Sequence, residues 1–192
     1  MVSLLRSSSS SSSSWLTQIL FSLLLLVILQ QHHDCYGCLH EERIALLDIK
    51  SSFSGDQGSV DPYSKFMSWN NSSDCCSWAG VRCSSTINQV TRLDISYTHQ
   101  PRNSNYTLNV SLFLPFREMR ALILSGNNIN GCIPSTDCFG SLAGLRKLEY
   151  LDISYNYFNG KDLSSLDALG SLKALSLRSN FIESELFIRG MY

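Results

Sequence analysis

The sequence predicts an α/β solenoid in the form of a horseshoe, with a parallel sheet on its concave face and a disulfide-bonded cap at its N-terminal end. Two observations carry this prediction. Three nine-residue stretches, at residues 119–127, 148–156 and 172–180, share the pattern L-x-x-L-x-L-x-x-N. Methionine replaces the first leucine in one copy, and isoleucine replaces the third leucine in another. A cysteine-rich block precedes them. Self-similarity of this kind is typical of repeat architectures, in which each unit stacks only on its neighbours.

The apolar residues within each stretch alternate with other residues, which predicts a short strand with one buried face. The side chains expected to point inward are Leu122, Leu124, Leu151, Ile153, Leu175 and Leu177. Their neighbours, including Ile123 and Tyr150, are expected to point outward. One unit is too small to bury its own leucines, so neighbouring units must stack to form a continuous core.

An asparagine ends each copy, namely Asn127, Asn156 and Asn180. The backbone loses its ladder partners where the chain turns away from the strand, and a buried amide can satisfy those groups. A fainter copy at residues 90–98 has Thr98 in this position, which indicates a less regular first turn. Counted from the first copy, equivalent inner leucines lie 29, 29 and 24 residues apart.

This repeated unit resembles the leucine-rich repeat. After the first asparagine, residues 127–134 read N-N-I-N-G-C-I-P, which is similar to the N-x-I-x-G-x-I-P form of plant-specific leucine-rich repeats. Residues 156–160 keep half of that form, and residues 180–183 lack its glycine. The resemblance implies about four repeats over residues 87–192, with no C-terminal cap.

The first 37 residues are predicted to be a signal peptide. Arg6 precedes a serine run at residues 7–14 and an apolar stretch at residues 16–29. That stretch is short for a transmembrane helix, which needs about 20 residues, but suits a signal-peptide core. Small residues at Cys35 and Gly37 fit cleavage before Cys38. The mature chain is therefore expected outside the cell or at its surface; an uncleaved anchor is the alternative.

Cleavage there leaves six cysteines, namely Cys38, Cys75, Cys76, Cys83, Cys132 and Cys138. An even number in a secreted chain favours disulfides, and six cysteines allow 15 connectivities. A zinc site is the rival interpretation. The spacings include no paired C-x-x-C and the histidines are scattered, so we predict no metal site.

Residues 38–86 do not follow the repeat pattern. One face of a helix is predicted from the spacing of Leu39, Leu46, Ile49 and Phe53. Glu41 and Glu42 fall in its first turn, where they favour the helix dipole. The helix is followed by a tryptophan and by C-C-x-W-x-G-V-x-C at residues 75–83.

This block resembles the N-terminal cap of plant leucine-rich repeat proteins, whose pattern also includes A-L-L-x-x-K, here residues 45–50. The resemblance implies the disulfides Cys38–Cys75 and Cys76–Cys83, and it makes Trp69 and Trp78 core residues of the cap. Cys132 and Cys138 lie outside the cap pattern, six residues apart; a local disulfide between them is our hypothesis.

Four N-x-S/T sequons predict glycosylation of surface loops, at Asn70, Asn71, Asn105 and Asn109. The sequons of Asn70 and Asn71 overlap, so at most one of these two is expected to be used.

The sequence contains no recognisable catalytic or cofactor-binding motif, so we expect neither an enzyme nor a cofactor. Fifteen basic residues balance sixteen acidic ones, which argues against a nucleic-acid surface. Outward positions of the predicted strands are the candidate ligand face: Arg92, Asp94, Ile123, Tyr150, Asp152 and Arg178. Their mixture of charged and aromatic groups suits a protein, peptide or glycan partner.

Cap and repeats together resemble the start of a plant receptor-like protein. Such proteins sense extracellular ligands in defence or development and signal through partner receptor kinases, so a co-receptor kinase is an expected partner. Membrane attachment would then need a C-terminal anchor or an uncleaved signal. Two alternatives stay open: an inhibitor of cell-wall hydrolases similar to the polygalacturonase-inhibiting proteins, or a truncated fragment that does not signal.

Overall fold

The computed structural model describes residues 15, 17–24, 37–54, 64–98, 106–133 and 137–182. The chain divides into two units, Met1–Cys35 and Tyr36–Tyr192. In the first unit, residue 15 and residues 17–24 are helical. Among the described residues, no helix is both long enough and apolar enough to cross a bilayer. Most of the predicted signal peptide, including Arg6, the serine run and Cys35, lies outside the described residues.

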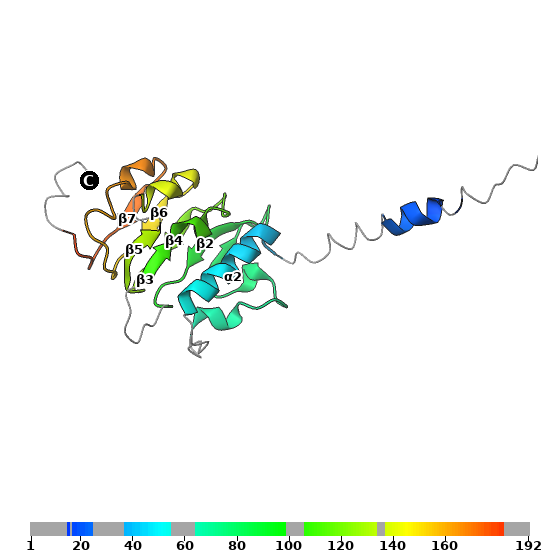
Figure 1. Cartoon of the computed structure of the whole chain (residues 1–192), viewed down its shortest axis with the longest axis horizontal. Helices are drawn as coiled ribbons and strands as arrows, with labels where there is room; N and C mark the ends of the chain where they lie inside the picture. The colour runs from blue at the N-terminus through cyan, green and yellow to red at the C-terminus, as the bar shows by residue number, and fades with distance from the viewer. Residues whose placement is uncertain are drawn as a thin grey trace, which may run out of the picture. The chain divides into compact units, whose positions relative to one another are not determined.

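Helix α2 (His40–Ser54) is the longest element of the second unit (Figure 1). Its buried face includes Ala45, Leu46, Ile49 and Phe53. Leu39, which the sequence analysis assigned to this face, is 38% exposed because it precedes the first turn of the helix. Glu42 is buried instead, and its carboxylate accepts hydrogen bonds from the backbone N–H groups of Leu39 and Val90. This carboxylate therefore connects the cap helix to the first repeat strand.

Aromatic side chains fill the rest of the cap, next to the short 3-10 helices η1 (Lys65–Ser68) and η2 (Cys75–Ser77). The rings of Trp69 and Trp78 stack with their centroids 5.5 Å apart, and both side chains are buried. Each indole N–H has an acceptor, at 2.9 and 2.8 Å. Disulfides join Cys38 to Cys75 and Cys76 to Cys83. The predicted disulfide-bonded cap is thus present.

Within the described residues, the main sheet contains five strands in the order β1-β2-β4-β6-β7. These are β1 (Val81–Cys83), β2 (Val90–Asp94), β4 (Ala121–Ile123), β6 (Tyr150–Asp152) and β7 (Ala174–Ser176). Neighbours from β2 to β7 are parallel, and their inner leucines align at positions 93, 122, 151 and 175. Strand β1 runs antiparallel to β2. The cap therefore contributes an edge strand that the repeat pattern did not predict.

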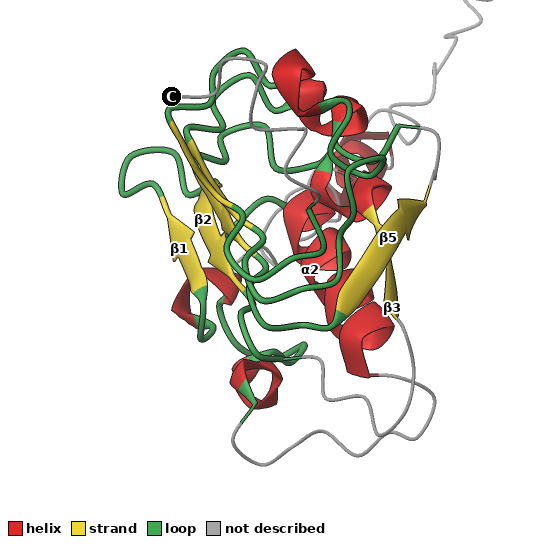
Figure 2. Cartoon of the chain, turned by 90° about the vertical axis from the view of Figure 1, so that its left-hand side faces the viewer, coloured by secondary structure: helices red, strands yellow, loops and turns green. Residues whose placement is uncertain are grey.

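A second, two-stranded parallel sheet pairs β3 (Tyr106–Asn109) with β5 (Ile129–Ile133). Figure 2 shows this sheet across the core from β1 and β2. Short 3-10 helices complete the return limbs of the units, namely η3 (Val110–Phe113), η4 (Gly140–Gly144) and η5 (Leu166–Ala168). The predicted leucine-rich repeat solenoid is therefore confirmed.

Burial of the inner leucines changes along the solenoid. Leu122, Leu124, Leu151 and Ile153 are fully buried. Leu175 and Leu177 point into the same core but are only half-buried. Strand β7 has a described neighbour on one side only, so its leucines are covered from one direction. Within the described part of the chain, the cap covers the core at one end of the sheet, and no further strand pairs with β7 at the other end.

Candidate functional site

The outward side chains of the main sheet form two lateral rows. One row contains Arg92, Ala121, Tyr150 and Ala174, and the other contains Asp94, Ile123, Asp152 and Ser176. Neighbouring strands lie about 4.8 Å apart, so in-register side chains are adjacent. Five of the six predicted face residues lie in these rows. The sixth, Arg178, follows β7 by two residues.

Asp94 is bonded on several sides at the cap end of the face. Lys65 from the cap donates to its Oδ1 at 2.5 Å, and the hydroxyl of Ser96 donates to the same oxygen at 2.7 Å. Arg92 lies 3.9 Å from Oδ2. Partial burial by itself would raise the pKa of Asp94, but the hydrogen bonds from Lys65 and Ser96 outweigh it and lower that pKa below its ordinary value. Asp94 is therefore a carboxylate whose charge is already compensated.

Asp152 holds the equivalent position on β6 with different surroundings. Its Oδ1 accepts hydrogen bonds from the backbone N–H of Ser154 at 2.9 Å and from the Ser154 hydroxyl at 2.6 Å. Burial raises the pKa of the nearby Tyr150 hydroxyl, and the charge of Asp152 and a hydrogen bond with it act in the same direction. Within the described ranges, no basic group lies within 4.0 Å of the Asp152 carboxylate.

Some outward positions of the repeat stretches are buried. Ile123 is only 5% exposed, because Asp94 and Asp152 flank it in register on both sides. Ser125 and Ser154 are also buried, at 7% and 5% exposed. The candidate ligand face is thus corrected at Ile123, whose side chain fills the space between the two carboxylates instead of reaching solvent.

The recurring asparagines connect successive units, as predicted. The amide of Asn127 donates to the carbonyls of Ile95 and Leu124, and its Oδ1 accepts from the backbone N–H of Thr98. Asn156 makes the equivalent bonds, with Asn127 as the backbone donor. Asn180 donates in the same way to Ile153 and Leu177, and its Oδ1 accepts from the backbone N–H of Phe158. Thr98, the predicted departure, donates its hydroxyl to the carbonyl of its own unit at Ile95. Each asparagine therefore satisfies the turn of the unit before it.

The residue directly before each of these positions has positive φ. The four residues are Tyr97, Gly126, Tyr155 and Ser179, at φ 56°, 69°, 54° and 57°. Left-handed backbone suits glycine and costs other residues about 1 kcal/mol, so its recurrence shows that the turn requires it. This position was not predicted from the sequence, although it always directly precedes the asparagine or its threonine counterpart.

Exposed aromatic side chains gather just beyond the carboxyl ends of the strands, and the sequence analysis did not assign them. Tyr97 and Tyr155 are 64% and 45% exposed. Arg178 lies over the ring of Tyr155, with its guanidinium carbon 5.8 Å from the centroid. The rings of Tyr157 and Phe181 stack at 5.5 Å. Arg178 is therefore engaged with an aromatic ring.

The described residues contain a third disulfide and one cluster of possible metal ligands. Cys132 is bonded to Cys138, with their Cα atoms 5.1 Å apart. Ligand atoms of Asp74, Cys75 and Cys76 lie within 4.8 Å of one another. Both sulfurs of that cluster belong to disulfides, and metal ligation requires thiolates. The cluster consequently offers one carboxylate and no ligand set.

Among the described sequons, Asn70 and Asn71 lie in a loop, and Asn109 ends β3 and caps η3. The Oδ1 atoms of Asn70 and Asn109 accept the hydroxyl hydrogens of Ser72 and Ser111, at 2.8 and 2.7 Å. Asn71 is exposed. Asn105 lies outside the described residues.

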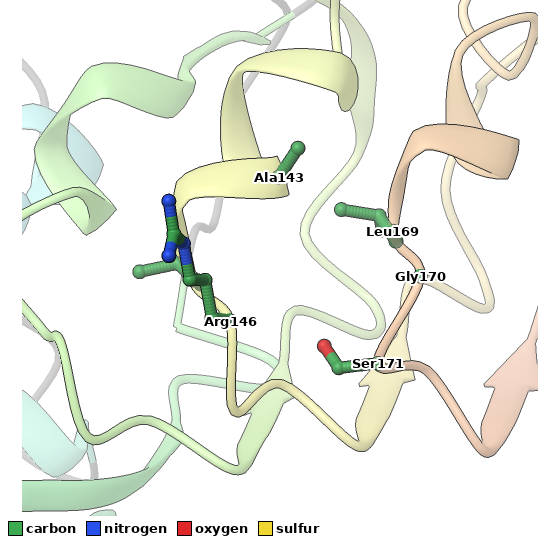
Figure 3. A pocket seen from close by; sticks show the side chains of 6 residues that line it. Ala143, Arg146, Leu169, Gly170 and Ser171 are labelled. Atoms are coloured by element: carbon green, nitrogen blue, oxygen red, sulfur yellow. The ribbon is translucent and has the colours of Figure 1, made fainter.

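A shallow pocket of about 300 Å³ lies between η4 and η5, away from the two rows (Figure 3). Its lining residues are Ala143, Leu145, Arg146, Leu169, Gly170 and Ser171. The hydroxyl of Ser171 donates to the carbonyl of Leu148 at 2.9 Å, which leaves Arg146 as the charged group of the lining. None of the predicted site residues contributes to this pocket.

Comparisons with known proteins agree with this architecture. Residues 39–84 match the family model for the leucine rich repeat N-terminal domain, and residues 147–169 match the model for the leucine rich repeat. Putative receptor-like protein 8 of Arabidopsis thaliana is 39% identical over 154 residues, which cover 79% of this chain and 15% of the relative. Receptor-like protein 14 of the same plant is 37% identical, with 79% and 16% covered. The chain thus spans about one sixth of the length of these relatives.

Solved structures are similar too. A crystal structure of PEPR1 with AtPEP1 has a TM-score of 0.54 and 27% identity, covering 75% of this chain and 18% of that one. The BIR3–SERK2 complex from Arabidopsis thaliana has a TM-score of 0.52 and 26% identity, covering 72% and 68%. With its cap motif, its asparagine-linked turns and these matches, the chain is a leucine-rich repeat solenoid with an N-terminal cap, and most of its length is similar to plant receptor-like proteins.

Proposed function

We propose that residues 38–192 form an extracellular ligand-recognition module, the N-terminal portion of a receptor-like protein in plant defence or developmental signalling. The observation that carries this proposal is the pair of in-register rows on the main sheet. They present the charged and aromatic side chains of β2 and β6, separated by the small or apolar side chains of β4. Binding residues held on rigid strands suit recognition, because little side-chain freedom is lost on binding.

The proposed partner is a protein or peptide, with a co-receptor kinase as a second partner. PEPR1, crystallised with AtPEP1, and a chain of the crystallised BIR3–SERK2 complex share the fold and about a quarter of the sequence. A glycan is the alternative partner expected from the sequence. We propose that the module binds without catalysis, since its outward acids and serines, such as Asp152 and Ser154, are bonded to one another in turns.

The proposed organisation is a signal peptide at 1–37, a cap at 38–86 and about four repeats at 87–192, entering the secretory pathway. Expression of the full chain in plant cells, followed by mass spectrometry of the secreted product, tests it. We expect a mature N-terminus at Cys38, glycan on at least one sequon and no free thiol at Cys132 or Cys138. A product that retains Met1 and stays with the membrane fraction would favour the uncleaved anchor.

Ligand binding is tested by selecting random displayed peptides against the secreted full chain. The key comparison is between the unsubstituted chain and the Arg92→Ala/Tyr150→Ala variant, which removes two face side chains without touching the core. We expect selected peptides to lose at least tenfold in affinity for this variant. The control is Lys161→Ala, an exposed lysine outside the strands. Equal binding to all three proteins would contradict the proposal.

A further inference from the structure

The two carboxylates of the face differ in charge compensation, and this difference identifies what the face can bind. Asp94 has Lys65 at 2.5 Å and Arg92 at 3.9 Å. Asp152 occupies the equivalent place on β6 and has no basic group within 4.0 Å in the described part of the chain. The two positions share backbone register and side-chain type, so their unequal compensation is a property of their neighbours.

The two arginines of the predicted face are already engaged. Arg92 lies 3.9 Å from the carboxylate of Asp94. Arg178 is exposed, but its guanidinium lies over the ring of Tyr155. The cap lysine that compensates Asp94 has no counterpart beside β6 in the described residues. Neither arginine is paired with Asp152, so its carboxylate is available to a cation from a partner.

Asp152 is also held ready for such a cation. Two hydrogen bonds from Ser154 fix its Oδ1, and the hydroxyl of Tyr150 donates a further one to the carboxylate. An ionised carboxylate has about four acceptor sites, so capacity remains for an external donor. Its in-register neighbour Ile123 is buried, and this apolar neighbour strengthens electrostatic attraction by lowering the local polarity.

The surroundings fit a lysine or arginine side chain in particular. Such side chains lay an aliphatic stem on apolar surface and keep the charged end at a polar group. Ala121 and Tyr150 lie side by side in the next row and offer a small residue and an aromatic ring. A ring within about 6 Å adds cation–π attraction.

The rows extend across four strands, or about 14 Å at the usual strand spacing. One side chain cannot cover that width, whereas an extended polypeptide lying across the strands can contact Arg92 at one end and Asp152 farther along. Resting on the proposed function, we infer that this face binds an extended polypeptide through one of its lysine or arginine side chains, with the Asp152 carboxylate as the counter-ion.

The experiment starts from random seven-residue peptides selected against the full-length secreted chain. The most enriched peptide is synthesised, together with a version in which norleucine replaces its basic residue. Both are measured by calorimetry against the unsubstituted chain, Asp152→Asn and Asp167→Asn. Asparagine keeps an Oδ1 acceptor for Ser154, so the turn should survive, and thermal melting checks this. Asp167 is exposed on η5 and is the matched control for loss of one negative charge.

We expect one peptide position to be strongly enriched in lysine or arginine. The Asp152→Asn variant should bind the basic peptide about tenfold more weakly, with no change for Asp167→Asn. The norleucine peptide should bind both proteins equally, because the two changes remove the same interaction. Additive losses would overturn the inference. Peptides that bind the face without an enriched basic position would also overturn it while leaving the proposed function intact, and failure to select any peptide would count against both.

Discussion

The cap and the repeats share one continuous core but are stabilised in different ways. The cap depends on a few large contributions: two stacked tryptophans and two disulfides hold a short helix against the first strand. The repeats depend on many small contributions of the same kind, because each leucine and each asparagine makes contacts like those of its counterpart one unit earlier. The cap should therefore respond to damage as a whole, whereas the repeats should respond according to how many neighbours cover the damaged unit.

The largest expected effect comes from the cap. The Cys38→Ala/Cys75→Ala variant opens a disulfide across 37 residues of sequence. By chain entropy its free energy of unfolding should fall by about 4 kcal/mol. Urea unfolding followed by tryptophan fluorescence measures the loss, because two of the tryptophans lie in the cap core.

The matched control is Cys76→Ala/Cys83→Ala, which opens a disulfide across seven residues. Its expected loss is about 2.5 kcal/mol. If both variants lost the same free energy, the closing of loops would not be what stabilises the cap.

The next effect separates covered from open repeats. Leu151→Ala removes a fully buried side chain and should lower the free energy of unfolding by about 3 kcal/mol. Leu175→Ala, at the equivalent half-buried position, should cost about 1 kcal/mol. Circular dichroism during urea titration measures both. Equal losses would show that β7 is covered as well as β6 is.

A smaller effect concerns the asparagines. Asn127→Ala leaves the carbonyls of Ile95 and Leu124 and the N–H of Thr98 without this partner, in fully buried surroundings. The expected cost is about 2–3 kcal/mol. Asn180→Ala should cost about 1 kcal/mol, since water reaches that turn. The difference between the two melting temperatures is the readout, and a larger drop for Asn180→Ala would reverse the proposed order.

The smallest effect is in the pH dependence, and its sign differs between the two regions. Burial raises the pKa of Glu42 in the cap above its ordinary 4.5, more than hydrogen bonds from Val90 and Leu39 lower it. The folded state thus binds this proton more tightly than the unfolded state. Its stabilising contribution is complete below pH 4.5 and is lost as the pH rises through the raised pKa.

Asp94 on the repeats behaves in the opposite way. Its lowered pKa contributes stability above pH 3.8, which is lost as the pH falls through the folded value. Titrating the unfolding midpoint of Glu42→Gln and Asp94→Asn against the unsubstituted chain tests both signs. The Glu42→Gln difference should change above pH 4.5 and the Asp94→Asn difference below pH 3.8; matching trends would refute this assignment.

The parts of the fold that repeat were predictable from the sequence. Inward direction at Leu122 and Leu151 follows from alternation within nine residues, and the role of Asn127 follows from a turn that recurs. These features depend on local sequence and a fixed period. The cap was predictable for another reason, because its cysteine and tryptophan spacing resembles that of known caps.

The remainder depends on contacts between residues far apart in sequence. Ile123 is buried because Asp94 and Asp152 lie beside it, 29 residues away in either direction. Glu42 is buried because it bonds Val90, 48 residues away. On the face, Asp94 has an ion pair with Lys65, which lies 29 residues earlier in the sequence, whereas Asp152 has none among the described residues. No pattern of residue types reports those neighbours.

The direction of the asparagine bonds has a consequence for how the chain is made. Asn127 completes the turn at Ile95 and Thr98, and Asn156 in turn completes the turn at Leu124. The turn of a unit that has emerged from the ribosome can therefore be completed only after the asparagine of the next unit is synthesised, which for these units is 29 residues later. At about 5–20 residues per second the delay is roughly 1.5–6 seconds. During biosynthesis the youngest unit is always the unfinished one, and the cap, synthesised first, gives the growing array its fixed starting point.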